Sequence, residues 1–240
     1  MYQKIRRLII DMVKPQRIIR RRIQGVDLNL LRIGDMSEAM IEKALTEEPY
    51  TIHWILNMPK GSVLYDIGAN MGIYSILAAL TGKIVYAFEP MPYNLHLLYR
   101  NMQINHISKD RLYPVPVALG FGDHLQWQTV TPMRDAPGAA NIYAGDEASG
   151  IIPTIGLDFI SRQFFRPDYV KIDVDGPESD IILGGWNTLR KAKEIQIERR
   201  PGCREMMTQL GFGEAINFNF YKNHLDDRYE NLSWKEKVNV

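Results

Sequence analysis

The chain has 240 residues, of which 45% are hydrophobic, and its 29 basic and 28 acidic side chains give a formal net charge of +1. This composition excludes a disordered chain and suits one large α/β domain, or one such domain with an appendage. The near-neutral charge argues against a dedicated nucleic-acid binder. The single cysteine, Cys203, excludes an internal disulfide, and no Cys/His cluster has zinc-like spacing. No apolar run is long enough to span a bilayer and the residues after Met1 lack a secretory core, so a soluble cytoplasmic protein is expected.

The beginning of the chain predicts a basic appendage. Apolar residues at helical spacing predict a helix over residues 1–14, and alternation predicts two short strands over residues 17–30. Residues 36–58 are expected to be helical with a break at Pro49. Eight Lys or Arg side chains are opposed by one Asp in the first 23 residues. This excess suggests peripheral contact with an anionic membrane surface, a glycolipid or a nucleic acid, although a solvated cap or an oligomer contact is the favoured interpretation.

The stretch over residues 62–75 is the most informative part of the sequence. A short apolar run ends in Asp66 and passes through Gly68, Asn70 and Gly72 into a helix rich in Ala and Leu. Glycines let the backbone approach a ligand closely, and the new helix presents free N–H groups beside the turn. A dinucleotide site requires Gly-x-Gly-x-x-Gly for a pyrophosphate, which the carboxylate of Asp66 would repel. The acid suits instead the ammonium and sulfonium charges of S-adenosylmethionine (SAM), with a ligand-free tight turn as the alternative.

The next predicted strand supports a nucleotide cofactor. It covers residues 83–89 and ends in Glu89, seventeen positions after Gly72. This is close to the spacing at which a Rossmann-like unit holds both hydroxyls of an adenosine ribose. The loop and the acid together predict an adenosine-containing cofactor. A hydride-transferring dehydrogenase is the weaker alternative because the third loop glycine is missing.

The rest of the chain alternates strands and helices, which predicts a parallel sheet with its ligand at the carboxyl ends of the strands. Residues 132–153 are rich in small residues and too long for a simple connector, so they are either a lid or substrate loop or an irregular surface segment. The other predicted elements are a helix over residues 92–105, strands over residues 112–120 and 125–131, a helix up to residue 210, closing strands near residues 215–221 and a charged tail over residues 226–237.

Charged residues are concentrated in the predicted buried strand that begins at Tyr169. Lys171, Asp173 and Asp175 lie at alternate positions and therefore share a face, and Glu178 opens the following helix. Because an unpaired buried carboxylate is costly, we expect these acids to pair with Lys171 or to face a wet cleft beside the cofactor. A buried ion pair that only holds the fold together is the alternative.

A further strand, over residues 194–198, ends in Glu198 and would bring this acid to the sheet edge of Asp173. Such clusters occur preferentially at active sites. Mg²⁺ bound by these carboxylates is a less favoured alternative, and His53 is the most plausible base among five histidines without diagnostic spacing. The expected catalytic residues are Asp173, Asp175, Glu178, Lys171 and Glu198.

Five motifs in this order resemble the FkbM-type SAM-dependent methyltransferases. They are Asp66-Ile-Gly-Ala-Asn-Met-Gly72, Phe88-Glu-Pro90, Asn101 to Asn105, Thr154-Ile-Gly-Leu-Asp158 and Lys171-Ile-Asp-Val-Asp-Gly-Pro-Glu178. The resemblance covers about residues 50–200. The chain departs from it at Gly156, where the family usually has Thr, and at Asp175, where it usually has Glu.

The resemblance implies an α/β fold of the class I methyltransferase type, with a Rossmann-like, doubly wound and mostly parallel sheet that contains an antiparallel C-terminal strand. It divides the chain into an N-terminal helix, hairpin and helical cap over residues 1–49 and a SAM-dependent methyltransferase domain over residues 50–240. Asp66 and Gly68 would face the methionine part of SAM, and Glu89 its ribose. The full set of expected cofactor contacts is Asp66, Gly68, Asn70, Gly72, Glu89, Pro90, Asn105, Ala118 and Asp173, with Asn105 or Ala118 beside the adenine.

The implied activity is O-methylation of a hydroxyl on a sugar, a glycan or a secondary metabolite. Two other classes stay open, a nucleic-acid methyltransferase and a non-catalytic binding module. Cytosine C5 chemistry needs a nucleophilic cysteine, commonly after proline, whereas Cys203 follows Gly202. No Asn/Asp-Pro-Pro-aromatic tetrad for amino-group methylation is present either. The expected partner is therefore a small-molecule or glycan acceptor, and a homo-oligomer is left open.

Overall fold

The computed structural model describes residues 17–32, 34–132, 140–142, 150–174, 176–214 and 226–231. The helix expected over residues 1–14, the closing strands expected near residues 215–221 and the acid Asp175 lie outside these residues.

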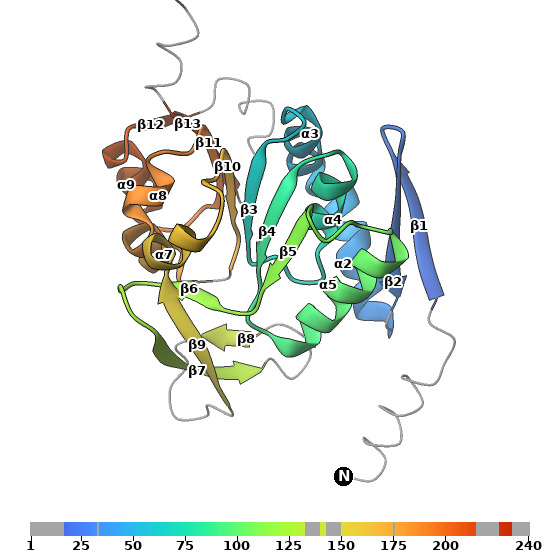
Figure 1. Cartoon of the computed structure of the whole chain (residues 1–240), viewed down its shortest axis with the longest axis horizontal. Coiled ribbons are helices and arrows are strands. Elements are labelled where there is room, and N and C mark those ends of the chain that lie inside the picture. The colour runs from blue at the N-terminus through green and yellow to red at the C-terminus, as the bar shows by residue number, and fades with distance from the viewer. Residues whose placement is uncertain are drawn as a thin grey trace, which may run out of the picture.

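A seven-stranded sheet forms the centre of the described chain (Figure 1). Its strands are β3 (Val63–Ile67), β4 (Ile84–Phe88), β5 (Leu112–Val115), β10 (Tyr169–Ile172), β11 (Glu194–Glu198), β12 (Phe212–Glu214) and β13 (Asp226–Asn231). Their spatial order is β12-β13-β11-β10-β3-β4-β5, with β13 antiparallel to both of its neighbours and the other pairs parallel. The expected class I methyltransferase sheet is thereby confirmed. Its winding reverses between β3 and β10, and open α/β sheets bind their ligands at the carboxyl ends of strands at such a point.

Helices cover both faces of this sheet. Alternate strand residues point to opposite sides, and apolar residues on both sides are buried under these helices. Leu64 of β3 belongs to one buried cluster and its neighbour Tyr65 to the other. The first cluster contains side chains of α3 (Pro49–Asn57), α4 (Ile73–Leu80) and α5 (Pro92–Ile104). The second contains side chains of α6 (Leu157–Ile160), α7 (Glu178–Gly184), α8 (Trp186–Leu189) and α9 (Cys203–Gln209), and a 3₁₀ turn over Ser161–Gln163 follows α6. Among the described residues, no helix combines the length and the apolar character needed to cross a membrane.

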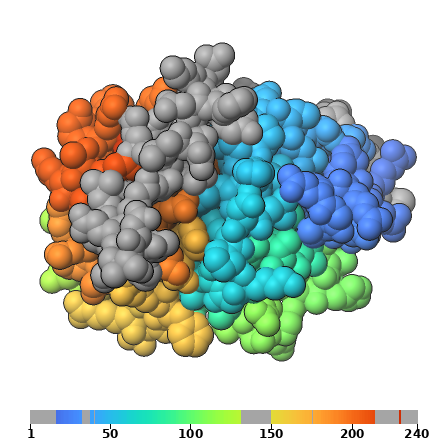
Figure 2. Space-filling view, turned by 90° about the horizontal axis from the view of Figure 1, so that it is seen from above, coloured from blue at the N-terminus to red at the C-terminus, as the bar shows by residue number. Residues whose placement is uncertain are grey.

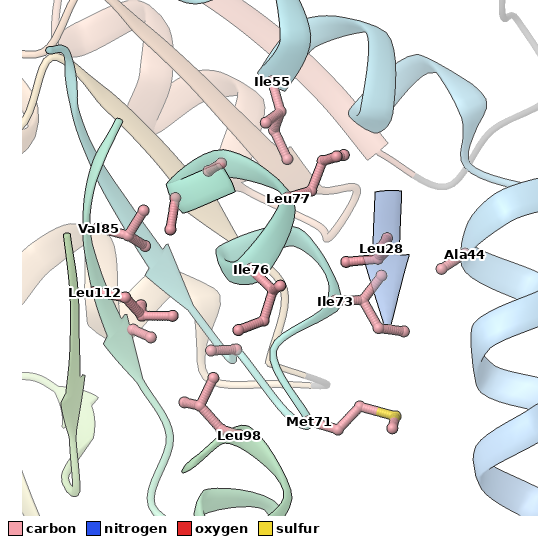
Figure 3. Close-up of a cluster of buried hydrophobic side chains, with 14 of the residues drawn as sticks. Leu28, Ala44, Ile55, Met71, Ile73, Ile76, Leu77, Val85, Leu98 and Leu112 are labelled. Atoms are coloured by element: carbon pink, nitrogen blue, oxygen red, sulfur yellow. The ribbon is translucent and has the colours of Figure 1, made fainter. Parts of the chain in front are cut away.

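The N-terminal hairpin shares the first buried cluster with the sheet. Strands β1 (Arg17–Ile23) and β2 (Val26–Arg32) pair antiparallel, as the sequence predicts, and α2 (Gly34–Thr46) follows them. Leu28 of β2 lies beside Ile73 of α4, and Ala44 of α2 belongs to the same buried cluster (Figure 3). The hairpin, blue in Figure 2, lies on the side of the molecule opposite α9, which is orange. The buried cluster is therefore continuous across the predicted division at residue 50.

A smaller second sheet has the order β6-β9-β7-β8. Its strand β6 packs closely against α7, because a Cβ at Gly184 of α7 would lie 1.9 Å from the carbonyl oxygen of Gly120 of β6. Its strands are β6 (Ala118–Gly120), β7 (Gln126–Pro132), β8 (Ala140–Ile142) and β9 (Gly150–Gly156). The strand expected over residues 112–120 is thus two strands in different sheets. The chain turns at Pro116, where the N–H of Val117 donates to Val115, and Pro114 is tolerated because β5 is an edge strand.

Strands are present in two segments that the sequence predicts to be irregular. The described parts of residues 132–153 include β8 and most of β9, so they are not a plain irregular surface segment, and a lid or substrate loop stays a prediction. Residues 226–231, expected in a charged tail, form β13 between β11 and β12. Two neighbouring strands supply hydrogen bonds to its backbone, and its Tyr229 is buried, so a strand forms here despite the charged composition.

Candidate active site

The loop between β3 and α4 is tightly wound. Gly68, Asn70 and Gly72 all have positive φ, of 82°, 52° and 85°. A Cβ at Gly68 would lie 1.9 Å from the carbonyl oxygen of Asp173, and one at Gly72 would lie 2.2 Å from Cδ1 of Leu98. Gly68 is therefore required by close packing against backbone, and Gly72 is favoured by its left-handed φ because the end of the Leu98 side chain can move. The loop presses directly on Asp173, the residue after β10.

Asp66 lies under this loop with one oxygen unused. Its side chain is 1% exposed, and the hydroxyl of Ser75 donates to Oδ2 at 2.5 Å. Burial raises the pKa of Asp66, which Lys171 on the neighbouring strand and the Ser75 hydrogen bond partly oppose. Oδ1 has no hydrogen-bond partner among the described residues. A buried acceptor without a partner is costly, so this oxygen fits a donor on a bound ligand.

Glu89 holds the loop from the end of β4. Its carboxylate accepts hydrogen bonds from the backbone N–H groups of Asn70, at 2.9 Å, and Met91, at 2.8 Å, and from the side chain of Asn94, at 3.1 Å. Burial raises the pKa of Glu89, and these hydrogen bonds oppose the shift. Because an ionised carboxylate has about four acceptor positions, one is left for a ribose hydroxyl. Pro90 lies between Glu89 and Met91 in this turn.

Lys171 and Asp173 form an ion pair on the same face of the sheet as Asp66. Asp66 lies on the neighbouring strand β3, in register with Lys171. The buried Nζ of Lys171 donates to Oδ2 of Asp173 at 2.7 Å, while the Asp173 side chain is one third exposed. Burial raises the pKa of Asp173, but Lys171, aided by Lys43 and Arg200, outweighs that effect and lowers the pKa below its usual value. Asp173 is therefore an ionised carboxylate at the rim of the site. The shared face expected from the alternating positions is confirmed for these two residues.

Glu198 lies beside Asp173, because Ile172 pairs with Ile197 and the next residues of both strands lie side by side. Nη2 of Arg200 donates to Oε2 of Glu198 at 2.7 Å. Burial and the charge of Asp173 raise the pKa of Glu198 to about 7, although Arg200 opposes the shift. A carboxylate with this pKa can accept a proton near neutral pH, as a general base must.

Glu178 joins the same cluster from the start of α7. Its side chain is fully buried, accepts the N–H of Gly176 at 3.2 Å and lies 3.7 Å from Nε of Arg200. Its Oε2 has no partner among the described residues. Arg200 thus bridges Glu178 and Glu198. Sequence reasoning missed Arg200, although a cation two residues after a strand-terminal acid was a usable signal.

Other predicted site residues lie elsewhere. The amide of Asn105 is engaged by β2 and α5, and its contact with the adenine stays a prediction. Oδ1 accepts the N–H of Asn29 at 2.9 Å, and Nδ2 donates to the carbonyls of Asn29 and Asn101. Ala118 is buried on β6 in a small apolar cluster with Val130 and Ile152. The exposed His53, on α3, has no described contact with the charged cluster.

The motif over residues 154–158 has a structural role. The carboxylate of Asp158 accepts the N–H groups of Asn187, at 2.9 Å, and Thr188, at 2.7 Å, at the start of α8. A Cβ at Gly156 would lie 1.9 Å from the carbonyl oxygen of Gly122, which explains the glycine that departs from the family pattern.

The charges of the cluster suit a cationic cofactor. Five carboxylates surround the loop and the ends of β10 and β11, against two cations within the cluster, Lys171 and Arg200. The carboxylates are Asp66, Glu89, Asp173, Glu178 and Glu198. The ammonium and sulfonium groups of SAM fit these surroundings. No three His, Cys, Asp or Glu side chains in the described part of the chain are grouped as metal ligands.

Comparison with known proteins gives the family. The model of the methyltransferase FkbM domain matches residues 66–220. Hexuronic acid methyltransferase AglP of Haloferax volcanii is 29% identical over 144 residues, which are 58% of this chain and 56% of that protein, so the match spans little more than half of the relative.

Solved structures with a similar fold include two methyltransferases. Magnesium protoporphyrin IX methyltransferase of Synechocystis PCC 6803, with bound SAM, is 12% identical, with 83% of this chain and 84% of that chain covered and a TM-score of 0.49. Precorrin-6y C5,15-methyltransferase of Geobacter metallireducens is 16% identical, with 70% and 71% covered and a TM-score of 0.46. Because the family match includes more than half of the chain, this protein belongs to the FkbM family of SAM-dependent methyltransferase domains.

Proposed function

We propose that this chain transfers the methyl group of SAM to a hydroxyl oxygen of a sugar, a glycan or a secondary metabolite. The observation that carries the proposal is the pair of carboxylates at the ends of β10 and β11, Asp173 and Glu198, beside the loop at Gly68. One is ionised and the other has a pKa of about 7. Two neighbouring acids with such different properties can divide the work of binding a cation and moving a proton.

The residues have distinct roles in this proposal. When bound, SAM supplies an activated methyl carbon for in-line displacement from sulfur. Asp66 and Glu89 would hold the ammonium and ribose groups of the cofactor, and Asp173 would offset the positive charge of its sulfonium. Glu198 accepts the proton of the attacking hydroxyl as the new C–O bond forms and the C–S bond breaks. Arg200 holds Glu198 in place for that step.

The charge of the site favours a hydroxyl over a carboxylate as the attacking group. A hydroxyl keeps its proton at neutral pH and needs a base, whereas an ionised carboxylate needs none and would be repelled by Asp173, Glu178 and Glu198. A sugar acceptor is supported by the relative AglP, which is a hexuronic acid methyltransferase. In an acidic sugar, we expect methylation on a hydroxyl oxygen.

The test is methyl transfer from isotope-labelled SAM to a panel of neutral sugars, hexuronic acids and glycans that contain them. We expect label in an acceptor of this panel as a base-stable ether, and a loss of rate by a factor of about 10² to 10⁴ in Glu198→Gln. Glu205→Gln, which changes an exposed acid on α9, is the matched control and should keep the wild-type rate. SAM binding without transfer to any member of the panel would support a binding module and contradict transfer to a sugar or a glycan.

We also propose a cytoplasmic location and a contact of the basic N-terminal region with an anionic surface. Arg17, Arg20 and Arg22 on β1 are exposed, and Arg22 forms a long 3.6 Å ion pair with the exposed Asp27. Cosedimentation with vesicles containing phosphatidylserine should exceed that with phosphatidylcholine and fall in a variant with all three changed to Gln. Equal sedimentation with both kinds of vesicle would instead favour a solvated face. Whether the chain forms a homo-oligomer is tested separately, by measuring its molar mass in solution with light scattering.

A further inference from the structure

Helix α3 and the residue before it lie outside the matched family region, yet they contact the charged layer of the sheet. Glu194, Gln196 and Glu198 alternate along β11 and share a face. The contacts are Trp54 Nε1 to Glu194 at 2.8 Å, Gln196 Nε2 to Thr51 Oγ1 at 2.6 Å and the Tyr74 hydroxyl to Glu48 at 2.6 Å. These three side chains tie α3 both to the strand that ends in Glu198 and to the helix that follows the loop.

The third contact leads directly to Lys171. Tyr74 is the second residue of α4, and the face of its ring lies 5.1 Å from Nζ of Lys171. Lys171 is 2% exposed, so its ammonium cannot keep a full hydration shell. Its neighbours include the carboxylate of Asp173, the aromatic ring of Tyr74 and, in register on the two adjacent strands, Asp66 and Gln196. An aromatic face attracts a desolvated ammonium through the negative charge density of the ring.

We propose that Tyr74 is a positioning residue that Glu48 orients and that holds Lys171 against Asp173. The contacts run from Glu48 to the hydroxyl of Tyr74, from the ring of Tyr74 to the ammonium of Lys171, and from that ammonium to the carboxylate of Asp173, which would face the sulfonium of SAM. Glu48 lies in the segment that joins α2 to α3, so a residue outside the matched family region contributes to the arrangement of the site. The inference rests on the proposed function, because it needs Asp173 near the sulfonium of SAM.

The readout is the discrimination between SAM and its demethylated product S-adenosylhomocysteine, measured by calorimetry. The product lacks the positive charge on sulfur, so an ionised and well-placed Asp173 favours SAM over it. Tyr74→Leu removes both ring and hydroxyl and should weaken SAM binding about tenfold while product binding changes less than threefold. Tyr74→Phe keeps the ring, and Glu48→Gln keeps a hydrogen-bond acceptor, so both should lie between Tyr74→Leu and the wild type.

A double-mutant cycle separates positioning from general damage. If Tyr74 acts through Lys171, Tyr74→Leu should add no further loss of discrimination in a Lys171→Met background. Tyr99→Phe and Glu47→Gln, which change an exposed tyrosine and the exposed acid next to Glu48, should match the wild type. Equal weakening of SAM and product, unchanged binding in Tyr74→Leu, or full additivity in the cycle would each overturn the inference. Failure of the wild-type protein to bind either ligand would instead overturn the proposed function.

Discussion

Glu198 shows how a single residue links the fold to the chemistry. Burial and Asp173 bring its pKa to about 7, while Arg200 keeps the side chain in one place. The rate of methyl transfer should therefore rise with pH and level off above about pH 7, because only the deprotonated carboxylate accepts the proton. The measurement is the pH dependence of kcat/KM. A profile that is flat between pH 5.5 and 8 would show that Glu198 is not the base.

The same raised pKa predicts an effect on stability. A glutamate in the unfolded chain has a pKa of about 4.3. Between that pH and about pH 7, Glu198 therefore keeps its proton in the folded state and loses it in the unfolded state. The ionised Glu198 thus lowers the free energy of unfolding above pH 7, and this loss disappears as the pH falls toward 4.3. Glu198→Gln should unfold at a higher temperature than the wild type at pH 8, with the difference shrinking at pH 5. Thermal unfolding at both pH values checks this, and Glu205→Gln is the control.

At the scale of elements, the loop between β3 and α4 depends on one close approach. Ala at position 68 would place its Cβ 1.9 Å from the Asp173 carbonyl and would also strain a φ of 82°. Gly61 has almost the same φ, 83°, with nothing within 4 Å of an added Cβ. Gly61→Ala should therefore lower the free energy of unfolding by about 1 to 2 kcal/mol and leave SAM affinity unchanged. Gly68→Ala should weaken SAM binding at least tenfold, because backbone has to move; equal affinities in calorimetry would contradict this.

Two asparagines one turn apart, Asn101 in α5 and Asn105 directly after it, accept hydrogen bonds from the backbone of β2. Oδ1 of Asn101 accepts the N–H of Leu31 at 2.8 Å, and its Nδ2 donates to the carbonyl of Met71 at 2.8 Å. Asn101→Ala leaves a buried N–H and a carbonyl without partners, which should lower the free energy of unfolding by about 2 to 4 kcal/mol. Urea denaturation measures the change. Gln103→Ala, on the exposed face of the same helix, should stay within about 0.5 kcal/mol of the wild type.

At the scale of the whole molecule, the hairpin and α2 behave as part of the core. Leu28, Leu30 and Ile41 are fully buried in the cluster that contains α4 and one face of the sheet. A chain that starts at residue 50 would expose that surface, so we expect it to aggregate or to unfold without a cooperative transition. Expression followed by thermal denaturation checks this. Cooperative unfolding near the temperature of the full chain would show that residues 50–240 fold alone.

Much of this architecture could be predicted from local patterns. Residue type predicts the tight loop at Gly68 and Gly72 and the ends of β3 and β11. The two-residue period of a strand predicts that Lys171 and Asp173 share a face. The position of Glu198 beside Asp173 follows from the rule that parallel strands end at one edge of a sheet. The loop, the strand ends and the shared face depend on neighbours a few residues away, whereas the position of Glu198 also needs the parallel pairing of β10 with β11.

Other features were decided only when distant segments came together. Asn105 contacts Asn29, 76 positions away, and Arg200 bridges acids from β11 and α7. Strand β13 forms because two neighbouring strands are present to bond its backbone, although its own composition resembles a tail. The sequence by itself determined where the loop and the acidic strand ends lie. Only the tertiary structure decided which polar groups meet, because a hydrogen bond or ion pair between distant residues leaves no periodic signal along the chain.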